Sequence, residues 1–252
     1  EQYLQLVDTS ANTVISERKL SDIAADSTIT ITGSSGNDVF NVDQSFLDLG
    51  ERDFIVQFDG GDGSDEVATD IDVTESGWQI SGEYSGSMGT GGIVEFSNTE
   101  KLSATQSDDS THLLSATNGS FNWQVTADNS GVLSILEDVE GSILQQVGPV
   151  NVEFYGFDEI VGTGTDYLDY SQLATGATVD LENDSATGFD KISGMQTLIG
   201  SVHSDTFTGD GNDNVFITDL TDTVNGNGGF DTVVIQDLDT SGRDLQLSVI
   251  TA

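Results

Sequence analysis

Aspartate and asparagine recur at a regular interval in the stretch Thr208 to Asp237 and just before it. Asp205 lies nine residues before Asn214, and Asp222 lies nine residues before Asp231. Their side chains offer hard oxygen ligands, which suit the flexible coordination of calcium. Carboxylates that stack on one another also repel, so a cation between them is the expected resolution. The residue types and their spacing therefore point to calcium bound at repeated turns.

The elements that would position these side chains follow from the neighbouring residues. An apolar side chain stands two residues after each of the four, at Phe207, Phe216, Val224 and Val233. A repeat of Gly-x-x-Gly-x-Asp-x-apolar predicts one turn and one short strand every nine residues. Glycine supplies the positive φ values of the turn, and the apolar residue points inward because side chains alternate along a strand. We therefore expect an all-β chain folded as a parallel β-solenoid (a β-roll or β-helix), with each Asp facing its equivalent one coil away.

The repeat is degenerate along most of the chain. The nonapeptide Gly60 to Ala68 fits the pattern at every fixed position, with Asp65 at the Asp position. A variant begins at Gly33 and has Ser34 where the second glycine would stand. Asn214 replaces one Asp, and His203 stands where a glycine is expected. We expect calcium at a few turns and not along a continuous row.

Composition excludes several classes of partner. The chain has 44 Asp and Glu against 6 Lys and Arg, a net charge of -38. Such a charge excludes nucleic acid and anionic membrane surfaces as partners, and its self-repulsion calls for divalent cations or high salt. The absence of Cys excludes disulfides and thiolate zinc sites. No stretch approaches the roughly 18 apolar residues of a membrane span. The chain starts at Glu1 without Met, and we interpret it as a piece of a longer or processed polypeptide.

A longer unit also repeats. When Phe96 is aligned with Phe154, similar residues stand at offsets 0, 4, 6, 8 and 12 in the two copies. Each copy is preceded by a tryptophan, Trp78 or Trp123, that is followed by Gln and a β-branched residue. Units at such uneven intervals fit a solenoid whose coils carry inserted hairpins. In the second insertion, residues 132–136 and 142–144 are predicted to form a hairpin. A compact β-sandwich is the architectural alternative.

These patterns divide the chain into three predicted parts. Residues 1–24 are expected to be an N-terminal cap or linker, since an open solenoid end is an unpaired edge. Residues 25–240 form the solenoid, with insertions at about 70–92 and 115–150. Residues 241–252 form a C-terminal cap or a link to the next module.

The motifs resemble the RTX (hemolysin-type) calcium-binding repeat family. The resemblance is carried by Gly60 to Ala68, by the variants at Gly33 and Gly226, and by the run 198–234; agreement is strong over 33–68 and 160–234. It implies a parallel β-roll or β-helix, export by a type I system, and calcium-driven folding outside the cell.

The resemblance also implies a set of calcium ligands. In the family the repeat Asp supplies a carboxylate, and carbonyls of the glycine-rich turn supply the other oxygens. Carried over to this chain, the metal-site residues are Asp38, Gly60, Gly61, Asp62, Gly63, Asp65, Asp205, Asp222, Gly226, Gly228, Gly229 and Asp231. Asp38 and Asp205 fit the pattern less strictly, and the calcium sites are expected above all around Asp222 and Asp231.

Motifs for catalysis are scarce. The sequence contains no P-loop, no G-x-S-x-G and no H-E-x-x-H. His112 and His203 are expected to be surface turn residues. Trp78 and Trp123 could stack on sugar rings, although their repeated context favours equivalent packing positions. We therefore expect no enzyme.

The sequence thus predicts a calcium-stabilised structural or adhesive module of a secreted bacterial surface protein, located outside the cell. Its expected partners are calcium and either further copies, in a fibre or surface layer, or acidic or neutral surface glycans. The alternative is a module that binds or modifies polysaccharide, of the lyase or epimerase type.

Overall fold

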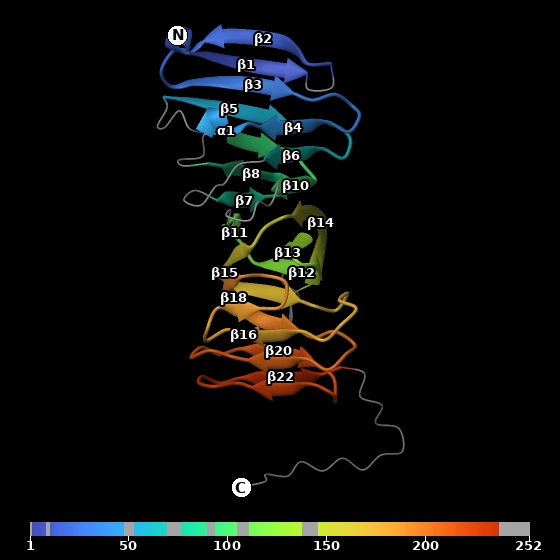
Figure 1. Ribbon diagram of the computed structural model, residues 1–252. Helices are drawn as coiled ribbons and strands as arrows, with labels where there is room; N and C mark the ends of the chain where they lie inside the picture. The colour runs from blue at the N-terminus through green and yellow to red at the C-terminus, as the bar shows by residue number, and fades with distance from the viewer. Residues whose placement is uncertain are drawn as a thin grey trace, which may run out of the picture.

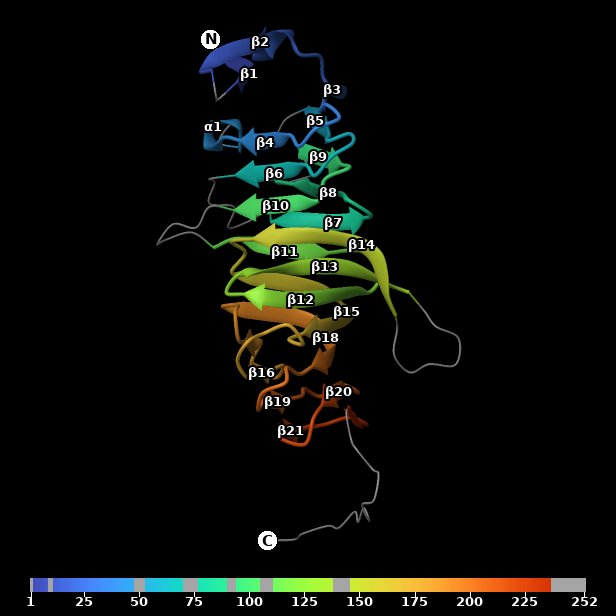
Figure 2. The same ribbon diagram turned by 90° about the vertical axis from the view of Figure 1, so that its right-hand side faces the viewer.

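The computed structural model describes residues 2–8, 11–47, 53–69, 77–89, 94–104, 111–137 and 146–236. Its strands stack along one long axis, with β1 and β2 at one end and β21 and β22 at the other (Figures 1 and 2). In these ranges helix is confined to two short turns, η1 (Leu20–Asp22) and α1 (Gln44–Leu47). None of the described helices is long and apolar enough to cross a membrane.

The N-terminal end is a hairpin. Strands β1 (Tyr3–Asp8) and β2 (Thr13–Lys19) pair antiparallel and form a two-stranded sheet of their own. Every β2 residue before Lys19 is exposed, so the hairpin buries little apolar surface. This hairpin fills most of the segment predicted to be a cap or linker.

Two columns of parallel strands follow the hairpin. One column contains β3 (Ser27–Thr32), β5 (Phe54–Asp59) and β9 (Val94–Ser97), and the other contains β4 (Val39–Val42), β6 (Glu66–Thr69) and β10 (Lys101–Ala104). Phe40 pairs with Val67, and Val67 pairs with Leu102 on the next strand. The inward position of each strand is apolar, as the alternation predicts.

Two antiparallel insertions interrupt the parallel stack. The first is made by β7 (Trp78–Gly82) and β8 (Ser85–Met88), which lead into β9, and the second by β12 (Phe121–Ala127), β13 (Ser130–Glu137) and β14 (Gln146–Tyr155). The two insertions are structurally equivalent, because in each a glycine on the middle strand lies against a phenylalanine ring on the third strand. A Cβ on Gly86 would lie 2.6 Å from the ring of Phe96, and a Cβ on Gly131 would lie 2.6 Å from the ring of Phe154. The longer repeat predicted from the sequence is therefore a repeated three-stranded unit.

The strand partners in the second insertion differ from the prediction. Residues 132–136 belong to β13, which pairs with β12 before it and with β14 after it. The second strand of the predicted hairpin, 142–144, lies outside the described residues. The sequence does not reveal β12 as a partner of β13, because β12 contains the Trp123 motif, which signals the longer repeat and not a hairpin.

Three strands connect the insertions to the C-terminal part. They are β11 (Leu113–Ala116), β15 (Glu159–Asp169) and β18 (Lys191–Ile199). β11 lies between β7 and β15, and β15 and β18 run parallel along most of their length. The register of β15 against β18 shifts between Val161 and Asp166. Gly162 and Gly194 lie close together at this point, so a Cβ on either would collide with the carbonyl oxygen of the other.

The C-terminal part repeats with a short, regular period. One face continues from β18 through β20 (Val215–Thr218) to β22 (Thr232–Ile235), and the other contains β17 (Ser185–Ala186), β16 (Thr178–Asp180), β19 (Thr206–Thr208) and β21 (Thr223–Asn225). Phe207 pairs with Val224, and Phe216 pairs with Val233, each 17 residues further on. The chain therefore returns to the same face after about two nine-residue repeats, one for each face; a segment that visits both faces once is called a coil below.

A single apolar core runs along the axis. Phe207 and Phe216 are fully buried, as predicted, whereas Val233 on the last described strand is 50% exposed. In the middle of the stack, Phe157 packs edge to face against Trp78, with ring centroids 5.5 Å apart. The chain is therefore all-β with large, mostly parallel sheets, and this part of the fold prediction is confirmed. Parallel pairing also disfavours the compact sandwich, whose sheets would be antiparallel.

Candidate functional site

The candidate site is a set of turns in which an Asp or Asn follows a glycine by five residues. The pairs are Gly33 and Asp38, Gly60 and Asp65, Gly200 and Asp205, Gly209 and Asn214, and Gly226 and Asp231. In every pair a Cβ on the glycine would lie within 2.9 Å of a side-chain oxygen of the Asp or Asn. The glycine is therefore required because the carboxylate or amide folds back over its Cα.

Asp205 shows what the folded-back carboxylate does. It is 1% exposed, and its Oδ2 accepts a hydrogen bond of 2.7 Å from the backbone N–H of Ser201 in its own turn. Its Oδ1 accepts one of 2.6 Å from the N–H of Ala177 in the preceding coil. Both carboxylate oxygens are thus used to fix backbone donors that the turn leaves without a strand partner.

The same side chains connect successive coils. The N–H of Asp205 donates to Oδ1 of Asp222 at 2.8 Å, and the N–H of Asn214 donates to Oδ1 of Asp231 at 3.0 Å. In the N-terminal block the N–H of Asp38 donates to Oδ1 of Asp65 at 2.7 Å. The predicted stack of Asp residues exists, but a backbone amide of the preceding coil faces each carboxylate. Amide donors therefore offset part of the repulsion for which the sequence suggested a cation.

Asn214 occupies the turn position that is Asp in the other four pairs. The sequence pattern treats it as a break in the repeat. In the structure it is 1% exposed, and its Oδ1 accepts a 3.0 Å hydrogen bond from the N–H of Asp210, just as Asp205 accepts from Ser201. This turn position therefore requires an oxygen acceptor and tolerates the loss of the charge.

Asp65, in the best nonapeptide, differs from the other turns. It is fully buried, and although its Oδ1 is used by Asp38, its Oδ2 has no hydrogen-bond partner. Its own N–H donates to Oε2 of Glu100 at 2.8 Å. Asp65 is therefore the middle member of a row of three acidic residues, Asp38, Asp65 and Glu100, which these hydrogen bonds connect. A buried carboxylate oxygen in such a row is costly unless a cation compensates it.

The remaining predicted residues lie on the outside of the turns. Asp62 is exposed, and Gly61, Gly63 and Gly229 have φ values of 95°, 138° and 102°. A Cβ on any of these three glycines would lie within 2.6 Å of a carbonyl oxygen of the neighbouring coil. Gly228 is exposed, and its N–H donates to the carbonyl of Asp210 at 3.0 Å. Within the described ranges, no three His, Cys, Asp or Glu side chains form a cluster that could hold a metal.

Asp166 is a buried carboxylate that anchors the second insertion. It is fully buried and accepts hydrogen bonds from Nε1 of Trp123 at 2.8 Å, from Oγ1 of Thr163 at 2.6 Å and from the N–H of Phe121 at 3.1 Å. Burial raises the pKa of Asp166, although these donors oppose the shift. No neighbouring residue in the sequence signals this role, because the contact with Trp123 joins positions 43 residues apart.

The raised pKa values of two buried aspartates predict that mild acid stabilises the protein. Burial raises the pKa of Asp166 and of Asp205 above the ordinary value of 3.8. A carboxyl with a raised folded-state pKa binds protons more tightly in the folded state, so its contribution to stability grows as pH falls toward that pKa and declines as pH rises through it. The free energy of unfolding, measured in urea with chelator at fixed ionic strength, should therefore rise as the pH is lowered from neutral to just above 3.8. Asp166→Asn should make this dependence on pH weaker.

The control for this prediction is Asp219→Asn. The hydrogen bonds from Thr221 lower the pKa of Asp219, which lies at the surface, so its effect on the slope has the opposite sign and is small. An Asp166→Asn variant with the wild-type slope would contradict the assignment.

The two histidines have different environments. His203 is exposed in a turn, as predicted, but His112 is fully buried, and the prediction of a surface residue is wrong. The backbone N–H of His112 donates to Oδ2 of Asp158 at 3.0 Å. His112 directly precedes β11, and this strand is enclosed between β7 and β15, which draws the residue inside. Both tryptophans are also fully buried, so their interpretation as packing residues is confirmed.

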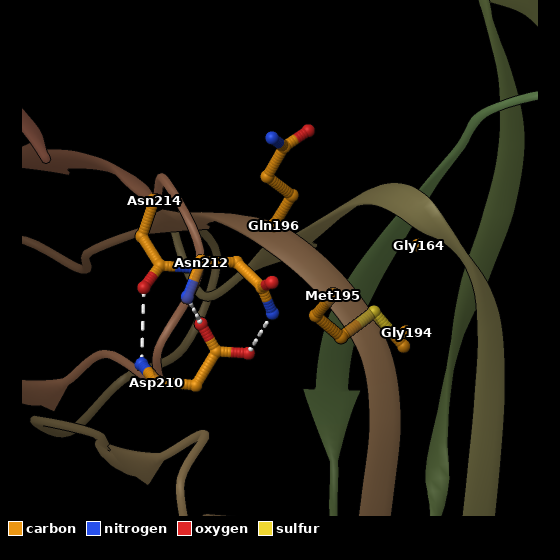
Figure 3. Close-up of a pocket in the computed structure, with 7 residues that line it drawn as sticks. All are labelled: Gly164, Gly194, Met195, Gln196, Asp210, Asn212 and Asn214. Carbon is orange, nitrogen blue, oxygen red and sulfur yellow. Dashed lines mark hydrogen bonds between the residues drawn. The ribbon is translucent and has the colours of Figure 1, made fainter. Parts of the chain in front are cut away.

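A polar hollow of 420 Å³ lies where β15, β18 and the turn before β20 meet. It is lined by Gly164, Gly194, Met195, Gln196, Asp210, Asn212 and Asn214 (Figure 3). The carboxylate of Asp210 accepts hydrogen bonds of 2.8 Å from both the N–H and the Nδ2 of Asn212. Polar groups that line the hollow are thus hydrogen-bonded to one another. No nucleophile and base meet among the lining residues of the hollow.

Comparison with known proteins adds no assignment. Neither the protein-family models nor the curated proteins contain a match to the chain.

Proposed function

We propose that the chain is a calcium-stabilised structural module of a secreted bacterial surface protein, folded as a parallel β-solenoid. The observation that supports this most is the 17-residue register on two faces at once, Phe207 with Val224 and Phe216 with Val233. A chain that returns to the same two faces every 17 residues follows a coiled path. Such a path builds length along one axis and contacts only its neighbours, which suits a spacer or adhesive stalk.

Calcium is proposed at the turn of Asp65. The buried Oδ2 of this residue has no hydrogen-bond partner, and Asp38 and Glu100 stand at the corresponding turns of the flanking coils. The carboxylate of Asp65 would hold the ion, which would place a positive charge beside the buried oxygen. Binding to the folded state alone would also offset part of the self-repulsion of a chain with a net charge of -38.

The sites around Asp222 and Asp231 stay predictions. Asp222 already accepts hydrogen bonds from the N–H groups of Asp205 and Asp219, at 2.8 and 2.7 Å. Calcium at this turn would have to share those oxygens with the amides. The turn of Asp65 therefore carries the stronger argument.

An extracellular location fits the same proposal. A chain without Cys obtains no stability from disulfides, and a bound divalent cation can supply it by mass action where calcium is abundant. The resemblance to exported RTX proteins supports the same location.

Calcium should raise the melting temperature at low salt. At a free concentration about 100 times the dissociation constant, one site adds about 2.7 kcal/mol to the free energy of unfolding. Asp65→Asn should lose most of this gain, whereas Asp62→Asn, which removes an equal charge from the exposed side of the same turn, should keep it. The measurement is thermal unfolding followed by circular dichroism, in calcium and in chelator at matched ionic strength.

The proposal fails if calcium and chelator give the same unfolding curve at low salt. A gain that sodium chloride reproduces at equal ionic strength would indicate screening and no site. A gain that survives in Asp65→Asn would place the ion at another turn.

A further inference from the structure

The C-terminal end of the stack is open within the described residues. β21 pairs only with β19, and β22 pairs only with β20, so each presents one backbone edge without a strand partner there. Apolar side chains surround these edges: Phe230 is 90% exposed, Val233 50% and Ile235 43%. Unpaired edges beside exposed apolar residues are surfaces on which another strand can add.

The N-terminal end has a matching character. The hairpin of β1 and β2 lies at that end in both views (Figures 1 and 2). Its exposed apolar side chains are Tyr3, Val7, Val14 and Ile15, with Ile15 65% exposed. A two-stranded hairpin is marginally stable alone, so a strand added to it would stabilise it.

The two ends also differ in charge. Residues 192–236 contain six aspartates and no Lys or Arg, a net charge of -6. Residues 2–19 contain Asp8 and Glu17 balanced by Arg18 and Lys19, a net charge of zero. In a chain this acidic, the hairpin is the end that an acidic end can approach without repulsion, and Arg18 and Lys19 attract it.

We propose that the C-terminal end of one copy docks on the N-terminal hairpin of a second copy, so that the stacks continue head to tail. The occupant of the open edge is a second copy of this chain. The contact joins two different surfaces, and repetition of such a contact yields an open filament and not a closed dimer. The proposal rests on the coiled architecture proposed above but not on calcium.

The test uses two variants that each block one end. Ile15→Glu places a negative charge on the hairpin, and Phe230→Glu replaces the most exposed apolar side chain at the other end. The wild-type mass from sedimentation velocity should rise with protein concentration, and each variant alone should stay monomeric. Mixed in equal amounts, the two variants retain one intact pair of ends and should form a dimer that grows no further.

Val202→Glu is the matched control, because Val202 is 77% exposed on a turn at the side of the stack. It should assemble like the wild type. A wild type that stays monomeric, or single variants that assemble like the wild type, would overturn the proposal. If the wild type stays monomeric but a chain that ends at Gln236 assembles, residues 237–252 and not a second copy occupy the open edge. Circular dichroism of each variant separates loss of assembly from loss of fold.

Discussion

Replacing Trp123 by alanine should lower the free energy of unfolding by about 3–5 kcal/mol, the usual loss for a large aromatic residue in a core. The indole is fully buried, and it packs edge to face on Phe154 with ring centroids 5.9 Å apart. It also donates its Nε1–H to the buried carboxylate of Asp166. Chemical denaturation in urea measures the loss, which should be accompanied by an unchanged m-value if only the folded state is affected.

The repeated insertion provides the control within the same chain. Trp78 occupies the equivalent position, but its buried Nε1 has no hydrogen-bond partner. Replacement by phenylalanine removes similar packing at both positions, yet only Trp123→Phe removes a donor from a buried carboxylate. We expect Trp123→Phe to cost about 1.5–3 kcal/mol more than Trp78→Phe. Equal losses would show that the bond to Asp166 contributes nothing net.

Asp205→Ala should be comparably damaging. The substitution leaves the N–H groups of Ala177 and Ser201 without their acceptor, and each orphaned buried donor costs about 1–3 kcal/mol. Measured by urea unfolding in chelator, the loss should therefore be several times that of a surface substitution. The chelator separates the role of hydrogen-bond acceptor from any role as a metal ligand.

The controls for Asp205 use the exchange that the chain itself displays at Asn214. Asp205→Asn keeps one oxygen acceptor and should lose less than Asp205→Ala. Asn214→Asp keeps the acceptor for Asp210 and adds one charge, so it should change stability only slightly in moderate salt. If Asp205→Asn and Asp205→Ala lose equally, the charge and not the acceptor is what the turn needs.

The sequence predicted the strands well because one simple rule governs them. Phe207 and Phe216 are buried and Asp205 sits at its turn because side chains alternate and glycines mark the bends. The same rule predicted the equivalence of Trp78 and Trp123. These features depend on residues close in the chain or on a period that the sequence displays directly.

The contacts of the turns could not be predicted in the same way. The environment of Asp166 depends on Trp123, 43 residues before it, and the burial of His112 depends on strands on both sides of it. Asn214 breaks the sequence pattern, which requires an Asp, but it fits the turn, which requires only an oxygen acceptor. Pairing of distant residues is set by register, which single-residue patterns do not specify.

The hydrogen bonds that the repeat Asp side chains accept from another coil run in one direction. The amide of Asp38 is held by Asp65, that of Asp205 by Asp222 and that of Asn214 by Asp231; the donor always comes earlier in the chain. Each of these amides therefore gains its acceptor only when the following coil is in place. At any stage of folding, the C-terminal coil of the ordered segment has one such amide without its acceptor. Loss of the coils that follow would therefore expose this amide, whereas loss of the coils that precede it would leave the bond intact.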